Sequence, residues 1–171
     1  MKNLVLLGIV CAIIMVSIAT GCTDNGDNEN GETPPREPAP PFTLTSIDDD
    51  TFSLSDFSGK VVILDFMYVN CQYCDDEMEH LQMIFDNYPK SKVVIITIDI
   101  LDTDTEEELR QFGEDYGDDW IYTFDTDDLV DKYDVVGVPK VVIIDQDAKI
   151  AYEHSGLTEY DTLSSKIDEL L

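Results

Sequence analysis

Cys71 and Cys74, separated by two residues, are the side chains of this chain best suited to redox chemistry. A thiolate attacks a disulfide bond, and a second thiol nearby can attack the resulting mixed disulfide and release the product. A bond between these two cysteines would close a loop too short to stabilise the fold much. The pair therefore predicts thiol–disulfide exchange rather than a structural cross-link.

A zinc half-site is the main alternative for a C-x-x-C pair, because structural zinc usually takes four protein ligands. The chain has no second C-x-x-C pair, and His80 and His154 are not spaced as a matched pair. We therefore expect no metal and no cofactor other than a redox-active disulfide between Cys71 and Cys74.

The elements around the cysteines would place them at the start of a helix. Residues 61–67 form an apolar run typical of a strand buried on both faces, and residues 72–88 have helical spacing ended by Pro89. Cys71 would then lie at the positive end of the helix dipole, which lowers the pKa of a thiol. Cys74 lies one turn further on and would act as the resolving thiol.

Two carboxylates lie close to this pair in sequence. Asp65 is the single charge in the strand run; burial would raise its pKa, and it could then accept a proton from Cys74. Glu77 follows Cys74 by three residues and shares its helix face. The alternatives are an Asp65 at a solvated strand edge and a Glu77 that is an ordinary acid favouring the helix dipole.

Val138-Pro139 is a second local signal, because proline opens a strand here although it cannot join a central ladder. We expect a cis bond at Pro139, which would leave the backbone of Val138 free to pair with a substrate strand; a trans bond is the alternative. Gln72 and Tyr73, between the cysteines, are expected to contact the same substrate.

The rest of the chain alternates strands and helices, which predicts an α/β domain with a central, partly parallel sheet. Leu163, Ile167, Leu170 and Leu171 are expected to face inward, Thr103 or Asp104 to cap a helix, and Trp120 to serve packing. The expected hairpins span residues 42–54 and 140–152, the second strand residues 93–98, and the further helices residues 104–116, 127–133 and 158–171.

The N-terminal part of the sequence predicts a secretory signal and a membrane attachment. Lys2, an apolar run at residues 4–19 and small residues before Cys22 make a secretory signal, and Ala19-Thr20-Gly21-Cys22 resembles a lipoprotein signal in which Cys22 becomes lipidated. An uncleaved membrane anchor is the alternative. Residues 1–22 would thus be the signal or anchor, residues 23–40 a flexible, acidic, Pro-rich linker, and residues 41–171 the domain, held outside the cytoplasm at the membrane.

The formal net charge of −27, from 37 acidic and 10 basic residues, argues against nucleic-acid binding, which needs a basic surface. The same charge favours solubility and is also expected of a protein adapted to concentrated salt.

Over residues 41–171 the chain resembles the thioredoxin superfamily, especially the membrane-anchored TlpA-type thiol-disulfide reductases. The resemblance rests on five segments: residues 54–60 (LSDFSGK), 62–66 (VILDF), 71–74 (CQYC), Glu77, and 133–139 (YDVVGVP). It implies a thioredoxin fold with an N-terminal hairpin, an exposed attacking Cys71, a resolving Cys74, and a cis Pro139 facing them. It also implies that Asp65 is the buried proton acceptor and Glu77 an active-site glutamate.

Several positions depart from the family pattern. Asn70 replaces an aromatic residue, and Met67 replaces a tryptophan. Glu79 replaces a helix-kinking proline, and Tyr73 replaces a proline or histidine. These changes alter the surroundings of the sulfurs, so the direction of electron flow stays open.

The resemblance implies an extracytoplasmic oxidoreductase acting on protein thiols and disulfides, in cytochrome maturation or on secreted proteins, and supplied by a membrane electron-donor protein. A Sco-like copper metallochaperone of the same fold is the alternative, since a thiolate pair can bind copper(I). A peroxide reductase is disfavoured because neither Arg36 nor Arg110 is placed for it.

Overall fold

The computed structural model describes residues 35–116 and 120–171. The predictions for the signal or anchor, for Cys22 and for most of the linker therefore lie outside the described residues. Within these two ranges, no helix is long and apolar enough to cross a membrane.

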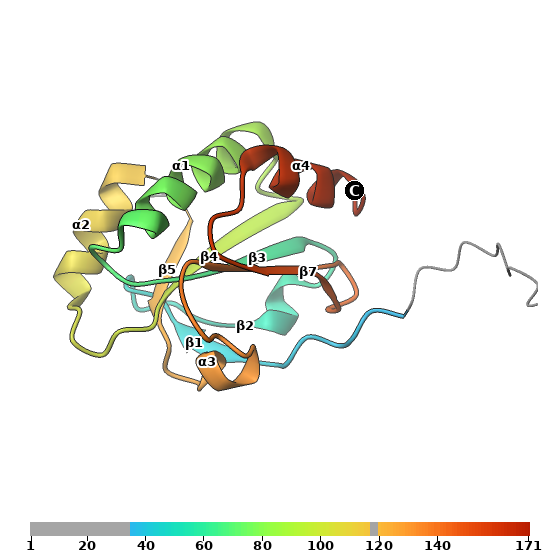
Figure 1. The fold of residues 1–171 in the computed structure, drawn as a ribbon. Coiled ribbons are helices and arrows are strands. Elements are labelled where there is room, and N and C mark those ends of the chain that lie inside the picture. Colours follow the sequence, from blue (N-terminus) through green and yellow to red (C-terminus); the bar gives the residue numbers. More distant parts are fainter. Residues whose placement is uncertain (1–34, 117–119) are drawn as a thin grey trace, which may run out of the picture. The chain divides into compact units, whose positions relative to one another are not determined.

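A five-stranded sheet forms the centre of the domain (Figure 1). β3, β4 and β5 run parallel, whereas β6 is antiparallel to β3 and β7 is antiparallel to β6. This confirms the expected mixed sheet and adds β5, a short strand that the sequence did not single out. The strands in spatial order are β5 (Ile121–Phe124), β4 (Val93–Asp99), β3 (Val61–Met67), β6 (Lys140–Ile144) and β7 (Ile150–Ser155).

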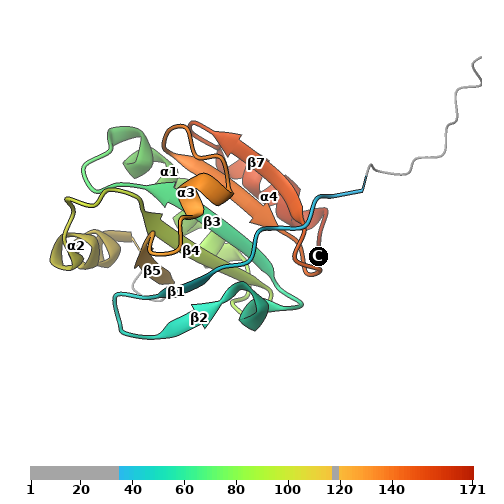
Figure 2. The same cartoon turned by 90° about the horizontal axis from the view of Figure 1, so that it is seen from below.

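Helices cover one face of the sheet, and a hairpin with a short helix covers the other (Figures 1 and 2). The first face carries α1 (Gln72–Asn87), α2 (Glu106–Tyr116) and α4 (Tyr160–Asp168). The second face carries the hairpin of β1 (Thr43–Thr45) and β2 (Thr51–Ser53), the 3-10 helix η1 (Leu54–Phe57), and α3 (Leu129–Lys132).

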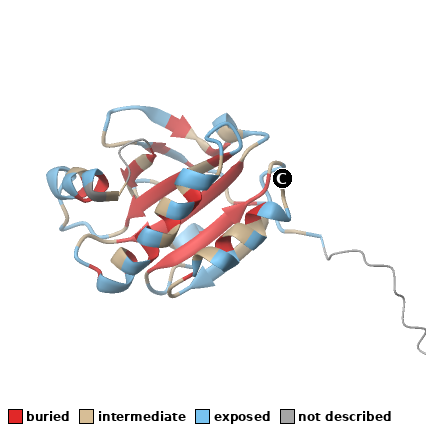
Figure 3. Ribbon diagram, turned by 90° about the horizontal axis from the view of Figure 1, so that it is seen from above, coloured by how far each residue is buried: buried red, intermediate tan, exposed pale blue. Residues whose placement is uncertain are grey.

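Strand β3 separates the two cores by simple alternation. All seven of its residues are buried, as the colouring in Figure 3 indicates for the central strands. Ile63 and Met67 pack under α1, α2 and α4, whereas Leu64 and Phe66 pack under the hairpin and α3. Because side chains alternate along a strand, Asp65 points to the same side as Ile63, under α1.

Residues before position 41 also contact the folded domain. Arg36 pairs with Asp145 at 3.0 Å, and the backbone N–H of Ala39 donates to the carbonyl oxygen of Ala148 at 2.9 Å. The side chain of Ala39 is itself buried in the second core. The last residues of the segment expected to be a linker thus lie along the turn between β6 and β7, which their Pro-rich composition did not indicate.

Two local predictions were wrong. Helix α2 is capped by Thr105, not by Thr103 or Asp104, because the Thr105 hydroxyl and the Glu108 carboxylate each accept the other residue's backbone N–H. Leu171 is 52% exposed, because α4 ends at Asp168 and the last residues leave the helix. Leu163 and Ile167 are buried, as expected.

Candidate active site

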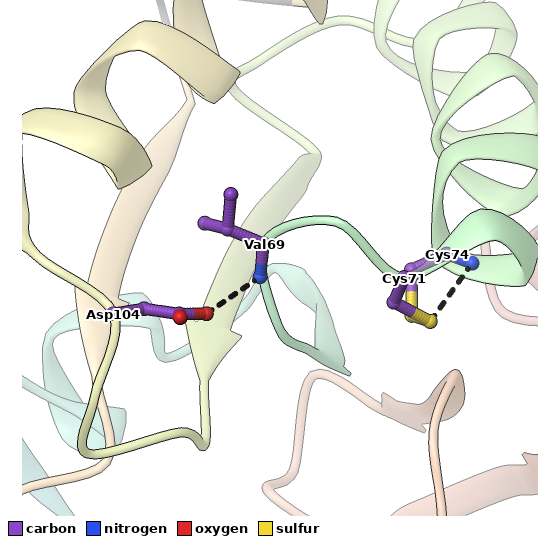
Figure 4. Close-up of a disulfide and its surroundings, with 4 residues drawn as sticks. All are labelled: Val69, Cys71, Cys74 and Asp104. Carbon is purple, nitrogen blue, oxygen red and sulfur yellow. Dashed lines mark hydrogen bonds between the residues drawn. A yellow bond between two sulfur atoms is a disulfide. The ribbon is translucent and has the colours of Figure 1, made fainter.

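Cys71 and Cys74 form a disulfide at the N-terminus of α1, with their Cα atoms 5.2 Å apart (Figure 4). Cys71 is the residue that caps the helix, and its Sγ accepts the backbone N–H of Cys74 at 3.3 Å. This donor, together with the helix dipole, would favour negative charge on the first sulfur.

Both cysteines are nearly inaccessible in this oxidised form. Cys74 is 1% exposed, and Cys71, which the family resemblance implied to be exposed, is only 5% exposed. The reason is that both side chains belong to the core under α1. Cys71 is still the more accessible of the two residues.

A short turn, residues 68–70, leads from β3 to Cys71. Asn70 has a φ of 65°, in the left-handed region that asparagine tolerates better than most residues. The backbone N–H of Val69 donates to Asp104 Oδ2 at 2.9 Å, so the loop before α2 holds this turn from outside (Figure 4).

Asp99 is a buried carboxylate next to this contact, and sequence reasoning missed it. It ends β4, is 1% exposed, and accepts the backbone N–H of Leu101 at 2.8 Å. Burial raises the pKa of Asp99 to about 6, the Leu101 N–H opposes the rise, and the charge of Asp104 adds to it. A charged residue at the end of an apolar run was a signal already visible in the sequence, as it was for Asp65.

Asp65 lies in the middle of the sheet and is 1% exposed, so the solvated strand edge does not describe it. The hydroxyl of Thr97, its neighbour on β4, donates to Asp65 Oδ2 at 3.1 Å. Burial raises the pKa of Asp65 to about 7, and the Thr97 hydrogen bond partly opposes this rise.

Glu77 faces the interior from α1, one turn after Cys74, and has no exposed surface. Its Oε1 accepts the backbone N–H of Thr158 at 3.1 Å, while Oε2 is buried without a hydrogen-bond partner among the described residues. Burial and the negative charge of Asp65 raise the pKa of Glu77 to about 8. Glu77 is therefore not an ordinary surface acid of the first turn.

The peptide bond between Val138 and Pro139 is cis, as expected. Val138 packs against both cores, including the one that contains the two cysteines. The carbonyl oxygen of Pro139 accepts the backbone N–H of Gly156 at 2.7 Å. Gly156 has a φ of 101°, which favours glycine, and it starts the connection whose Thr158 N–H holds Glu77.

Exposed side chains and a hollow lie near the disulfide. Tyr73 is 67% exposed and Gln72 is exposed beside it, so both are available to a bound partner. A polar hollow of about 440 Å³ adjoins the turn before Cys71; it is lined by Val69, Asn70 and Asp75 and, from α2, by Glu108, Gln111, Phe112 and Tyr116. Across residues 35–116 and 120–171, no group of three or more His, Cys, Asp or Glu side chains is placed to hold a metal ion.

The chain is similar to known thiol-disulfide oxidoreductases. Residues 35–153 match the AhpC/TSA family. The chain is 29% identical over 119 residues to the thiol-disulfide oxidoreductase ResA of Bacillus thuringiensis, covering 69% of this chain and 68% of that protein. ResA of Geobacillus kaustophilus is 23% identical over 170 residues, which cover 99% of this chain and 97% of the relative.

A solved structure agrees with these relatives. A thioredoxin-like protein of Aeropyrum pernix is 30% identical and superposes with a TM-score of 0.67, covering 75% of this chain and 88% of its own. The expected thioredoxin fold and thiol–disulfide chemistry are thereby confirmed. The chain belongs to the AhpC/TSA family and is, within it, a thioredoxin-fold thiol-disulfide oxidoreductase of the ResA type.

Proposed function

We propose that this oxidoreductase is an extracytoplasmic, membrane-anchored reductase of protein disulfides, with Cys71 as attacking thiol and Cys74 as resolving thiol. One observation carries the proposal: the Cys71–Cys74 disulfide lies at the N-terminus of α1, and Glu77, one turn further along the same helix, is buried near Asp65.

The reaction follows from this arrangement. The Cys71 thiolate attacks one sulfur of a client disulfide, forms a mixed disulfide, and releases the first client thiolate. Cys74 then gives its proton to a buried carboxylate, Asp65 above about pH 7 or Glu77 above about pH 8, and its thiolate attacks Cys71 Sγ. The Cys71–Cys74 disulfide forms, the second client sulfur leaves as a thiolate, and two electrons have passed to the client.

The direction of electron flow is inferred from charge. A strongly stabilised thiolate stabilises the reduced protein and makes a thioredoxin-fold protein an oxidant. Here Asp65 lies under the helix that carries the cysteines, Glu77 faces the interior from that helix, and Asp75 is its first-turn acid. Where these two carboxyls are ionised, above about pH 7 for Asp65 and about pH 8 for Glu77, their negative charge opposes thiolate formation, so the reduced pair is poorly stabilised and gives its electrons away readily.

The clients and the electron donor follow from the reaction. A reductase of protein disulfides needs cysteine-containing client proteins, and outside the cytoplasm it needs a membrane protein that supplies its electrons. Maturation of cytochromes, whose haem-binding cysteines must be reduced, is the client reaction we propose. Val138, Gln72 and Tyr73 would contact the client.

The reduction potential of the Cys71–Cys74 pair tests this proposal. We expect a value near or below about −250 mV for the full chain in detergent, equilibrated with glutathione or dithiothreitol buffers. A value above about −180 mV would make the protein an oxidant or isomerase and contradict the proposed direction. Failure to form the disulfide at all would contradict the redox function itself.

The anchor is tested separately on protein extracted from native membranes. Lipidation predicts a mature chain that begins at a modified Cys22, and Cys22→Ser should release the protein from the membrane or block its processing. An unmodified chain beginning at Met1 would instead mark the apolar run as an uncleaved anchor.

A further inference from the structure

Lys140 is a nearly buried cation next to the cis proline, with a relative exposure of 4%. It is the first residue of β6 and directly follows Pro139. Because side chains alternate along β6, and Val141 packs under the helices while Val142 packs under α3, Lys140 points toward α3. Burying an ammonium group is costly unless its donors find acceptors.

The Lys140 ammonium meets three acceptors, which matches its three N–H donors. Nζ donates to the carbonyl oxygen of Tyr133 at 2.5 Å and to that of Asp134 at 3.3 Å. It also pairs with Glu153 of β7 at 3.1 Å. Tyr133 caps the C-terminus of α3, where backbone carbonyls lack partners within the helix and a nearby cation is favourable.

These contacts close a loop. The chain leaves α3 at Tyr133, runs through Asp134, which has a φ of 48°, and returns at Pro139 directly before Lys140. The loop exposes Val136, at 92%, and carries Val138, which packs against the core of the two cysteines. The Lys140 side chain ties the beginning of this loop to its end.

We propose that Lys140 is a positioning residue for protein clients: it holds the loop of residues 133–139 in the conformation that presents Val138 to the client. The proposal rests on the proposed binding of clients at Val138. Lys140 itself touches neither sulfur. It should therefore matter for a large client that lies along the loop and not for a small disulfide that reacts with Cys71 alone.

The experiment compares two substrates with the full chain in detergent, reduced beforehand. The second-order rate of its oxidation is measured with insulin, a protein disulfide, and with dithiodipyridine, a small one. In Lys140→Met, we expect the insulin rate to fall about tenfold, as for the loss of one charge-assisted hydrogen bond, and the dithiodipyridine rate to stay within about twofold of wild type.

Lys149→Met is the matched control, because it removes the same charge from the exposed turn between β6 and β7. It should leave both rates unchanged. An unchanged insulin rate in Lys140→Met, or an equal fall in both rates, would overturn the proposal. If Lys140→Met does not fold, Lys140→Gln, which keeps a donor, gives the same comparison with an expected loss of about threefold.

The two proposals fail separately. If wild-type protein does not reduce insulin at all, the proposed client reaction is wrong whatever Lys140 does. If wild type reduces insulin and the Lys140 variants do so equally well, only the positioning role is wrong.

Discussion

Asp104 accepts a hydrogen bond from the backbone N–H of Val69 at 2.9 Å, and through it the loop before α2 holds the turn that ends at Cys71 (Figure 4). Thr103 or Asp104 was expected to cap α2, and Thr105 performs that role instead. The carboxylate is thus used for the site rather than for the helix. Removing this carboxylate should therefore loosen the turn that leads to Cys71.

Asp104→Ala should lower the free energy of unfolding by about 1–3 kcal/mol, because the half-buried N–H of Val69 loses its acceptor. Chemical denaturation of the oxidised full chain measures this. Asp102→Ala removes an exposed carboxylate from the same loop and should change the stability by less than about 0.5 kcal/mol. Equal losses in the two variants would show that the contact with Val69 is unimportant.

The stability of the oxidised protein should fall as the pH rises from about 4 to about 8. The pKa values of Asp65 and Glu77 are raised from 3.8 and 4.5 to about 7 and about 8, so the folded protein keeps protons that the unfolded chain releases in this window. Glu77→Gln should therefore reduce the loss of unfolding free energy between pH 5 and pH 8, as measured by denaturation at each pH.

Glu79→Gln is the control for this pH effect, because it neutralises an exposed acid on the same helix. It should leave the pH dependence as in wild type. The interpretation of Glu77 as a buried acid that keeps its proton would be wrong if the two variants had the same profile.

Cys74→Ser should accumulate a mixed disulfide between Cys71 and a client protein, because the thiol that resolves it is missing. The adduct is measured on non-reducing gels as a band that disappears with dithiothreitol. Cys71→Ser should accumulate no adduct, because Cys74 is only 1% exposed and does not occupy the N-cap position of α1. Adducts in Cys71→Ser but not in Cys74→Ser would reverse the two roles.

Leu163→Ala should lower the free energy of unfolding much more than Leu171→Ala does. Leu163 is fully buried in the core under α4, so its truncation should cost about 2–5 kcal/mol. Leu171 is 52% exposed and should cost less than about 0.5 kcal/mol. Thermal or denaturant unfolding of the two variants measures this difference. Similar losses of stability would mean that the last residues do pack inward in solution.

Much of the fold was predictable because the strongest signals were local. The apolar run of β3 and the helical stripe of α1 have clear periods, so their bounds were predicted within one residue at most. β5 escaped because its four residues, Ile121–Phe124, are too few to show a period. It is recognisable only by its pairing with β4, which is a long-range property.

The active site likewise combines residues that local sequence patterns predicted with contacts that those patterns did not predict. Residue type and spacing were enough to identify the C-x-x-C pair, the lone charge of Asp65 and the proline before β6. They were not enough to identify the contacts that hold the site: Asp104 reaches Val69 across 35 positions, and Thr158 reaches Glu77 across 81. Such partners become visible only when the chain is folded, because nothing in the short-range pattern links them.

The connection between β7 and α4 serves two parts of the site within three residues. The N–H of Gly156 binds the carbonyl of Pro139, and the N–H of Thr158 binds Glu77. An insertion or deletion between them would misplace at least one of these donors. We therefore expect homologous chains to keep the length of this segment constant, and to place their insertions in exposed turns such as residues 48–50.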